Sequence, residues 1–479
     1  MFEKVFKLKS NGTTVRTELM AGLTTFMTMA YIIALNPNLL TDFGAEGTEL
    51  WNGVFMATCI ASAVGMFCMA FIANKPFALA PGMGLNSFFA VVVGNIVTMT
   101  GMTYVESFQS ALIIILVEGI VFIVLSLFNV REKIVESIPL GIRLGISPAI
   151  GLMLMNIGLG SNVSIYAAGN NFETPFFVMR DFFGALTPSV LQTAMGEAGY
   201  ATMILSTITM FVGLFVIIAM DKKGVKGAVL IGMLVASVVY WAGSFLFLNT
   251  NPFASLATAS FLPPVKDMVD TTLFKFNFAG FMEIGWFTII TLVITFCIID
   301  MFDTIGTLVG TASRAGMVDE NGNMPNMKEA LLSDAVGTIA GACTGTSTVT
   351  TFVESASGVE AGGRTGLTAL TTGVLFLACI FIAPIAAIIP AAATSSALIY
   401  VGVLMLQGLS KVDFKDMDQM VPVFLMLLAM PVSGSIGHGI GLGLIAYTII
   451  KIFSGKFKEV SILTYVISAL FIVKFFLVV

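Results

Sequence analysis

The chain is poor in charged residues: Asp, Glu, Lys and Arg make up 11% of its 479 residues, whereas apolar residues make up 57%. Its mean hydropathy of +0.98 is far above that of soluble domains. The long apolar runs also lack the strict alternation of membrane barrel strands. The sequence therefore predicts an all-helical polytopic protein of the lipid bilayer.

Residues that build catalytic or metal centres are scarce. His438 is the single histidine, and it has no carboxylate or cysteine neighbours in sequence. No Walker-type loop, metal cluster or nucleophile elbow is present. We therefore expect no enzyme, no cofactor and no nucleic-acid partner. The cysteines have no metal-ligand spacing and are expected to pack as small apolar side chains without a disulfide; they are Cys59, Cys68, Cys297, Cys343 and Cys379.

The apolar stretches predict about fourteen transmembrane segments, because a spanning helix needs about 20 mostly apolar residues. The stretch 460–479 is either one more span or an interfacial helix. The fourteen predicted segments are 17–35, 51–73, 77–97, 104–128, 145–160, 200–220, 225–248, 286–310, 329–343, 346–361, 366–389, 392–410, 420–434 and 437–453.

The placement of Lys and Arg predicts the orientation. Four basic residues precede the first predicted span, whereas the loop from Asn36 to Glu49 has none. By the positive-inside rule, the N-terminus should be cytoplasmic. We expect the protein to lie in the plasma or inner membrane. The long loops near 160–200 and 249–283 carry few basic residues, so we expect them outside.

Two short segments interrupt the apolar pattern at similar places in the two halves. They are Pro76 to Phe89, rich in glycine, and Gly345 to Gly366, rich in threonine and glycine. The β-branched run TSTVTT predicts a short extended piece, after which FVESASGV begins a half-helix with Glu354 near its N-terminus. Non-helical backbone at membrane depth is tolerated where it is buried in protein or lines a cavity, so the two segments should share one central site. An odd number of spans per half, seven here, predicts that the two halves are inverted repeats.

Three acidic residues lie inside apolar segments: Asp300, Asp303 and Glu354. An ionised carboxylate at bilayer depth costs at least about 2.5 kcal/mol, so it should face protein, water or a ligand. Asp300 and Asp303 lie on roughly one helix face with Thr307. Helix packing is the alternative role for the two aspartates, and helix capping is the alternative for Glu354.

Two carboxylates on facing elements suit a neutral planar solute with several N–H groups and would repel an anion. One of them could carry a coupling proton. Phe77, Phe88 and Phe89 could stack on such a solute, although apolar packing against lipid is the alternative. Glu118 is a further intramembrane acid with weaker support, and Asp334 lies near the start of a predicted span that it could cap.

The motifs NPNLL, APGMGLNSFF, DMFDTIGTLVG and TSTVTTFVESASGVEAGGRTGLT extend over nearly the whole chain. Together they resemble those of the AzgA-like guanine/hypoxanthine (purine nucleobase) permeases. That family is related to the xanthine and uracil permeases of the nucleobase/ascorbate transporters. The resemblance implies two inverted seven-segment repeats and elevator-type movement of a core domain (17–128 and 280–389) against a gate domain (129–248 and 390–479).

Carried over by position, the resemblance implies a purine site formed by Asp303 and Glu354, with contacts from the third segment near Met83 to Asn86. Ser355 is a further candidate for this site, because it lies beside Glu354. Uracil-type relatives have a proton-coupling histidine four residues after the eighth-segment acid.

Thr307 stands at the position of that histidine in this chain. Proton coupling should then depend on Asp303, Glu354 or Asp300, and a sodium ion held by Asp303 and nearby carbonyls is the alternative. The family also implies a homodimer. A competing function is an anion exchanger or channel of the same general fold.

Overall fold

The computed structural model describes residues 2–42, 46–128, 139–160, 163, 188, 192–257, 259–314, 317, 324–433 and 436–477. Within these ranges, eleven helices are long and apolar enough to cross a membrane, and two shorter apolar helices cover 417–433 and 462–473. The prediction of an all-helical polytopic membrane protein is confirmed. Most of the predicted outside loop near 160–200 falls outside the described residues.

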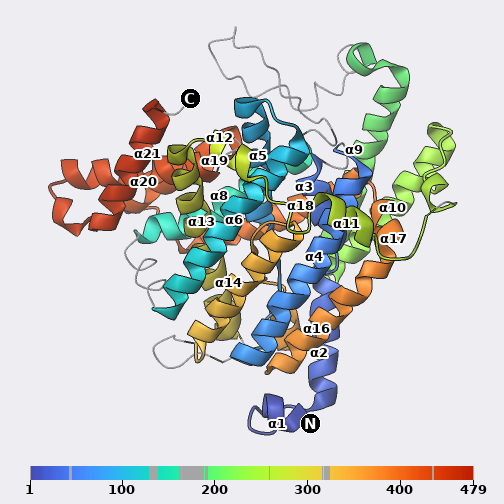
Figure 1. The fold of residues 1–479 in the computed structure, drawn as a ribbon, viewed down its shortest axis with the longest axis horizontal. Helices are drawn as coiled ribbons and strands as arrows, with labels where there is room; N and C mark the ends of the chain where they lie inside the picture. Colours follow the sequence, from blue (N-terminus) through green and yellow to red (C-terminus); the bar gives the residue numbers. More distant parts are fainter. Residues whose placement is uncertain are drawn as a thin grey trace.

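The first half of the chain supplies helices and one short strand (Figure 1). Its elements are α1 (Phe2–Phe6), α2 (Val15–Met29), α3 (Ile32–Leu40), α4 (Thr48–Cys68), the π-helical turn η2 (Met69–Ala73), β1 (Leu79–Pro81), α5 (Met83–Thr100), α6 (Tyr104–Leu127), α8 (Leu140–Leu159), α9 (Thr193–Lys222) and α10 (Ala228–Phe247). The connection to the second half contains η5 (Ala254–Ala257), α11 (Val265–Thr271) and α12 (Phe278–Glu283).

The second half again combines apolar helices with one short strand. Its elements are α13 (Trp286–Arg314), α14 (Met327–Thr344), β2 (Val349–Thr351), α15 (Ser355–Glu360), α16 (Gly366–Ala378), the 3-10 turn η6 (Cys379–Ile382), α17 (Ala383–Ala387), α18 (Ala391–Met405), η7 (Leu406–Lys411), α19 (Met417–Ser433), α20 (Ile436–Phe453), η8 (Phe457–Glu459) and α21 (Ile462–Leu477).

The first predicted span, 17–35, lies within one candidate membrane span, Val15–Leu40, which consists of two consecutive helices. α2 ends at Met29, and α3 begins at Ile32. The stretch 462–477, left open by the sequence, is helical and packs on α20.

Helix packing forms two groups. In the first group, α4 packs on α14 and α16, α2 packs on α15 and α16, and α6 packs on α13 and α14. In the second group, α8 packs on α18 and α19, α9 packs on α10 and α18, and α19 packs on α20. Contacts between the groups are sparser. Figure 1 shows α2, α4, α14 and α16 running side by side, with α20 and α21 at the left edge and α9 and α10 at the right.

The two strands lie inside the first group and pair with each other in antiparallel orientation. Leu79 is opposite Thr351, Ala80 is opposite Thr350, and Pro81 is opposite Val349. All six residues are buried. Because backbone groups in the apolar interior need partners, each strand satisfies the other. The pairing brings the two predicted breaks together, although about 270 residues separate them in sequence.

Candidate functional site

The hydroxyl-rich segment around β2 is held by one helix after another. Asn36 of α3 donates to Thr346 at 2.9 Å, and Ser347 donates to Asn86 of α5. Thr348 donates to Glu118 of α6 at 2.7 Å. The hydroxyl groups of Thr350 and of Thr304, which belongs to α13, share a hydrogen bond of 2.6 Å. All of these side chains are buried. The side-chain hydrogen bonds of the threonines and the serine in TSTVTT therefore anchor the extended segment inside the protein and fix its position among four helices.

Glu354 occupies the N-cap position of α15, directly after β2. Its side chain forms no capping hydrogen bond. Instead, the Tyr31 hydroxyl donates to Glu354 Oε1 at 2.8 Å. The capping alternative for Glu354 is therefore wrong. The half-helix with a carboxylate at its start is confirmed, and it comprises residues 355–360.

Asp303 lies on α13 and faces the start of α5. A Cβ atom built on Gly82, the N-cap of α5, would lie 3.6 Å from Asp303 Oδ2. α13, which carries Asp303, packs on α15, which follows Glu354, and both carboxylates are partly exposed. Among the described residues, neither forms an ion pair with Lys or Arg. The site therefore presents two carboxylates, from α13 and α15, near the ends of the paired strands.

Asp300 is one turn from Asp303 but is fully buried. Thr304 Oγ1 lies 2.9 Å from Asp300 Oδ1 and 3.1 Å from Asp334 Oδ2 of α14. Asp334 does not cap α14, because Asn326 is the N-cap and Asp334 lies two turns inside the helix. Thr304 thus links the buried acids of α13 and α14 behind β2.

The other predicted site residues lie on the same elements. Met83 begins α5 and is buried. Asn86, one turn later, donates to Asn36 Oδ1 at 2.6 Å and to the Pro81 carbonyl at 3.2 Å. The buried Ser355 hydroxyl accepts from the Ala78 amide at 2.9 Å, so Ser355 joins α15 to the segment before β1.

Thr307 is buried on α13, one turn after Asp303.

The three phenylalanines proposed for stacking are all buried. Phe88 packs on Phe296 with ring centroids 4.6 Å apart, and Phe89 meets Phe108 edge to face at 5.2 Å. For Phe88 and Phe89 the packing alternative is favoured, but against protein rather than lipid.

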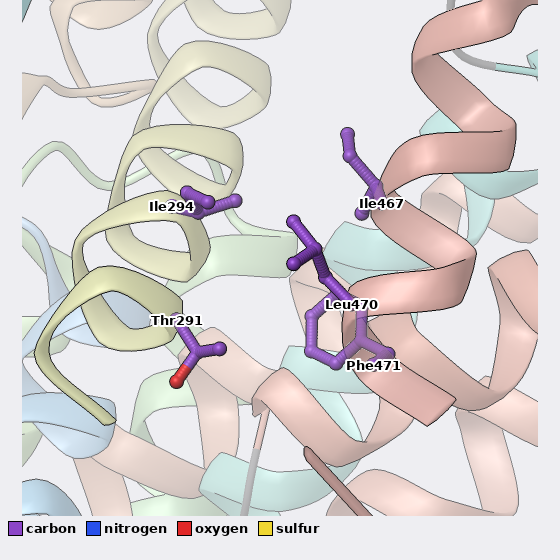
Figure 2. Close-up of a pocket in the computed structure, with 5 residues that line it drawn as sticks. All are labelled: Thr291, Ile294, Ile467, Leu470 and Phe471. Atoms are coloured by element: carbon purple, nitrogen blue, oxygen red, sulfur yellow. The ribbon is translucent and has the colours of Figure 1, made fainter. Parts of the chain in front are cut away.

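A shallow apolar depression lies between α13 and α21 (Figure 2). It is lined by Thr291, Ile294, Ile467, Leu470 and Phe471. Thr291 and Ile294 point toward α21 from the first part of α13, about two turns or more before the acidic residues. Because the depression carries no charged group, it is not the candidate site.

Residues 16–436 match the model of a protein family described as the permease family. The chain belongs to the permease family. This permease is a multi-pass membrane protein and not an enzyme. The resemblance inferred from the sequence motifs is confirmed by two relatives that match almost end to end.

The guanine/hypoxanthine permease PbuO of Bacillus subtilis is 37% identical over 477 residues, which cover 99% of this permease and 100% of the relative. The adenine permease AdeP of Escherichia coli is 37% identical over 474 residues, which cover 99% and 96% of the two chains. Among solved structures, the transmembrane domain of a cyanobacterium bicarbonate transporter, BicA, is similar with a TM-score of 0.62. Its sequence is 16% identical, and the match covers 88% of this permease and 97% of that chain, so the likeness concerns the fold.

Sequence reasoning missed Tyr31 and Glu18 of this permease and gave Glu118 little weight. Glu18 is fully buried on α2 and accepts three hydrogen bonds at the start of α16: from the amides of Arg364 (2.8 Å) and Thr365 (3.2 Å) and from the Thr368 hydroxyl (2.6 Å). Glu18 was not recognised because it lies at the predicted cytoplasmic end of α2, where charged residues are common. A signal for Glu118 was present, because an acid within LIIILVEGIVFIV needs a buried partner.

Proposed function

We propose that this permease is a secondary active transporter that imports purine nucleobases. The observation that carries the proposal is the pair of carboxylates, Asp303 and Glu354, at the junction of the two strand–helix elements. Two relatives, named as an adenine permease and a guanine/hypoxanthine permease, support the same substrate class. They differ in the purine, so the proposal names the class and leaves guanine, hypoxanthine and adenine as candidates.

The donor and acceptor chemistry supports a neutral solute. An ionised carboxylate only accepts hydrogen bonds, and purine nucleobases offer ring and exocyclic N–H donors. The competing function, an anion exchanger or channel, has support from the fold of the bicarbonate transporter. An anion site needs positive charge, whereas Asp303 and Glu354 lie without a basic ion-pair partner among the described residues. The acidic site therefore favours the nucleobase.

For the mechanism, we propose elevator-type alternating access. The group that contains β1, β2 and α13 to α16 would form the core domain, over 17–128 and 280–389. The group around α8, α9 and α18 to α20 would form the gate domain, over 129–248 and 390–479. The hydrogen bonds that tie β2 to four helices support movement of the core as one body, and the sparser contacts between the groups support sliding between them.

The proposed arrangement consists of fourteen segments in two inverted repeats, with a cytoplasmic N-terminus. The symmetric sequence strand, then helix, in each half supports the repeats. A homodimer remains a prediction from the family.

For coupling, we propose a proton carried by Asp303, Glu354 or Asp300, with Thr307 in place of the histidine of the uracil-type relatives. A buried acid is neutralised at low cost by a proton, which would make inward movement of the core depend on the proton gradient. Sodium held by Asp303 is the competing coupling ion.

The test is uptake of radiolabelled hypoxanthine, guanine and adenine into proteoliposomes under an imposed inward proton gradient, repeated with a sodium gradient. Glu354→Gln and Asp303→Asn should each lower uptake by about 100-fold or more, because each removes an acceptor charge at the ligand. Glu360→Gln is the matched control, since Glu360 is exposed on the same short helix.

Gradient-driven accumulation that fails in both site variants and persists in the control would support the proposal. Full uptake by both site variants would refute the site. Saturable sulfate or bicarbonate exchange without purine uptake would move the function to the anion class.

A further inference from the structure

Tyr31 lies where the first membrane helix is broken. α2 ends at Met29, Ala30 is its C-cap, and α3 starts at Ile32. The Tyr31 side chain is fully buried. Close packing of α15 on α2 brings Glu354 to this break: a Cβ atom on Gly358 would lie 2.9 Å from the Ala21 carbonyl, so this approach requires glycine.

The contact between the phenol and the carboxylate is specific. Tyr31 donates to Glu354 Oε1 at 2.8 Å, and Tyr31 is the only side chain among the described residues that donates to this carboxylate. A hydrogen bond to an ionised acceptor is about twice as strong as one between neutral groups. The bond therefore fixes the orientation of the carboxylate and partly satisfies one of its two oxygens, while Oε2 remains the stronger acceptor for a ligand.

Purines differ in how many donors they present on one edge. Hypoxanthine presents one ring N–H, whereas guanine presents that N–H beside an amino group. A carboxylate with two equivalent oxygens accepts such a two-donor edge in a bidentate manner, as it accepts a guanidinium group. A carboxylate with one oxygen already occupied loses part of that advantage.

We infer that Tyr31 is a positioning residue that sets purine specificity by occupying one oxygen of Glu354. This inference rests on the proposed function, because it assigns a discriminating role within the same purine site. Removing the phenol hydroxyl should free Oε1 and favour the two-donor edge of guanine over the one-donor edge of hypoxanthine. A tyrosine that only filled space would leave this preference unchanged.

The experiment measures KM and maximal rate for guanine and hypoxanthine in proteoliposomes containing wild type or Tyr31→Phe. In the variant, the ratio of kcat/KM for guanine to that for hypoxanthine should rise about fivefold or more, in line with one charge-assisted hydrogen bond. Tyr31→Met, a second variant without the donor, should shift the ratio in the same direction. Tyr104→Phe is the matched control, since Tyr104 donates to the Leu40 carbonyl at the far end of α3 (2.9 Å).

An unchanged ratio in either donorless variant, with wild-type transport intact, would overturn the inference and leave the proposed function standing. An equal shift in Tyr104→Phe would also overturn it. Transport of adenine without guanine or hypoxanthine would overturn the inference and leave the proposed function standing. Failure of the wild type to transport or bind guanine, hypoxanthine and adenine would instead overturn the proposed function.

Discussion

Gly82 occupies a tight position between β2 and Asp303, and replacing it by alanine should impair transport specifically. It is the N-cap of α5, between β1 and the helix, with φ of −70° and ψ of 124°. Alanine adopts these angles without strain. The effect of Gly82→Ala therefore comes from the added methyl group alone.

The atoms around Gly82 determine how much the added methyl group costs. The new Cβ would lie 2.7 Å from Thr350 Cγ2 and 3.4 Å from Leu85 Cδ1, whereas carbon atoms pack best at about 3.5–4.0 Å. Thr350 cannot simply turn away, because its hydroxyl bonds Thr304 and its backbone pairs with Ala80. Relief requires β2 to move by roughly 1 Å, and such overpacking typically costs about 1–3 kcal/mol.

The displaced strand leads directly to Glu354, and the methyl would also approach Asp303. If about 1.4 kcal/mol of the cost falls on ligand binding, the KM for the transported purine rises about tenfold. Thermal unfolding of the detergent-purified protein, with and without purine, would separate lost stability from lost binding.

Gly94→Ala is the control on the same helix, because a Cβ there meets nothing within 4 Å. Equal melting temperatures and equal KM values for Gly82→Ala and Gly94→Ala would refute this prediction.

Two further substitutions test the buried acids outside the site. Glu18→Gln should lower the free energy of unfolding by about 1.5–3 kcal/mol, because it weakens charge-assisted hydrogen bonds at the start of α16. Equal melting temperatures for Glu18→Gln and the control Glu360→Gln would contradict this prediction. Thr348→Val should lower the free energy of unfolding by about 1–3 kcal/mol, because it removes the hydrogen-bond donor to Glu118. Thr98→Val, at an exposed position, should leave the free energy of unfolding nearly unchanged. An unchanged melting temperature for Thr348→Val would show that β2 does not need this hydrogen bond.

The sequence alone determined the membrane class, the two breaks and the acidic character of the site. Hydropathy is a sum over neighbouring residues, so membrane spans can be recognised without knowing which residues they contact in the fold. β-Branched TSTVTT disfavours a helix locally, and Glu354 follows it at the start of the next helix.

Only the tertiary structure decided which groups meet. Nothing near Tyr31 or Glu354 in sequence indicates that they bond across 323 positions, or that Asp334 approaches Thr304 rather than capping its own helix. The antiparallel register of β1 and β2 was equally hidden. The physical reason is that hydrogen-bond partners in an apolar interior are selected by helix packing, and that packing depends on close contacts such as Gly358 against α2 that no local pattern encodes.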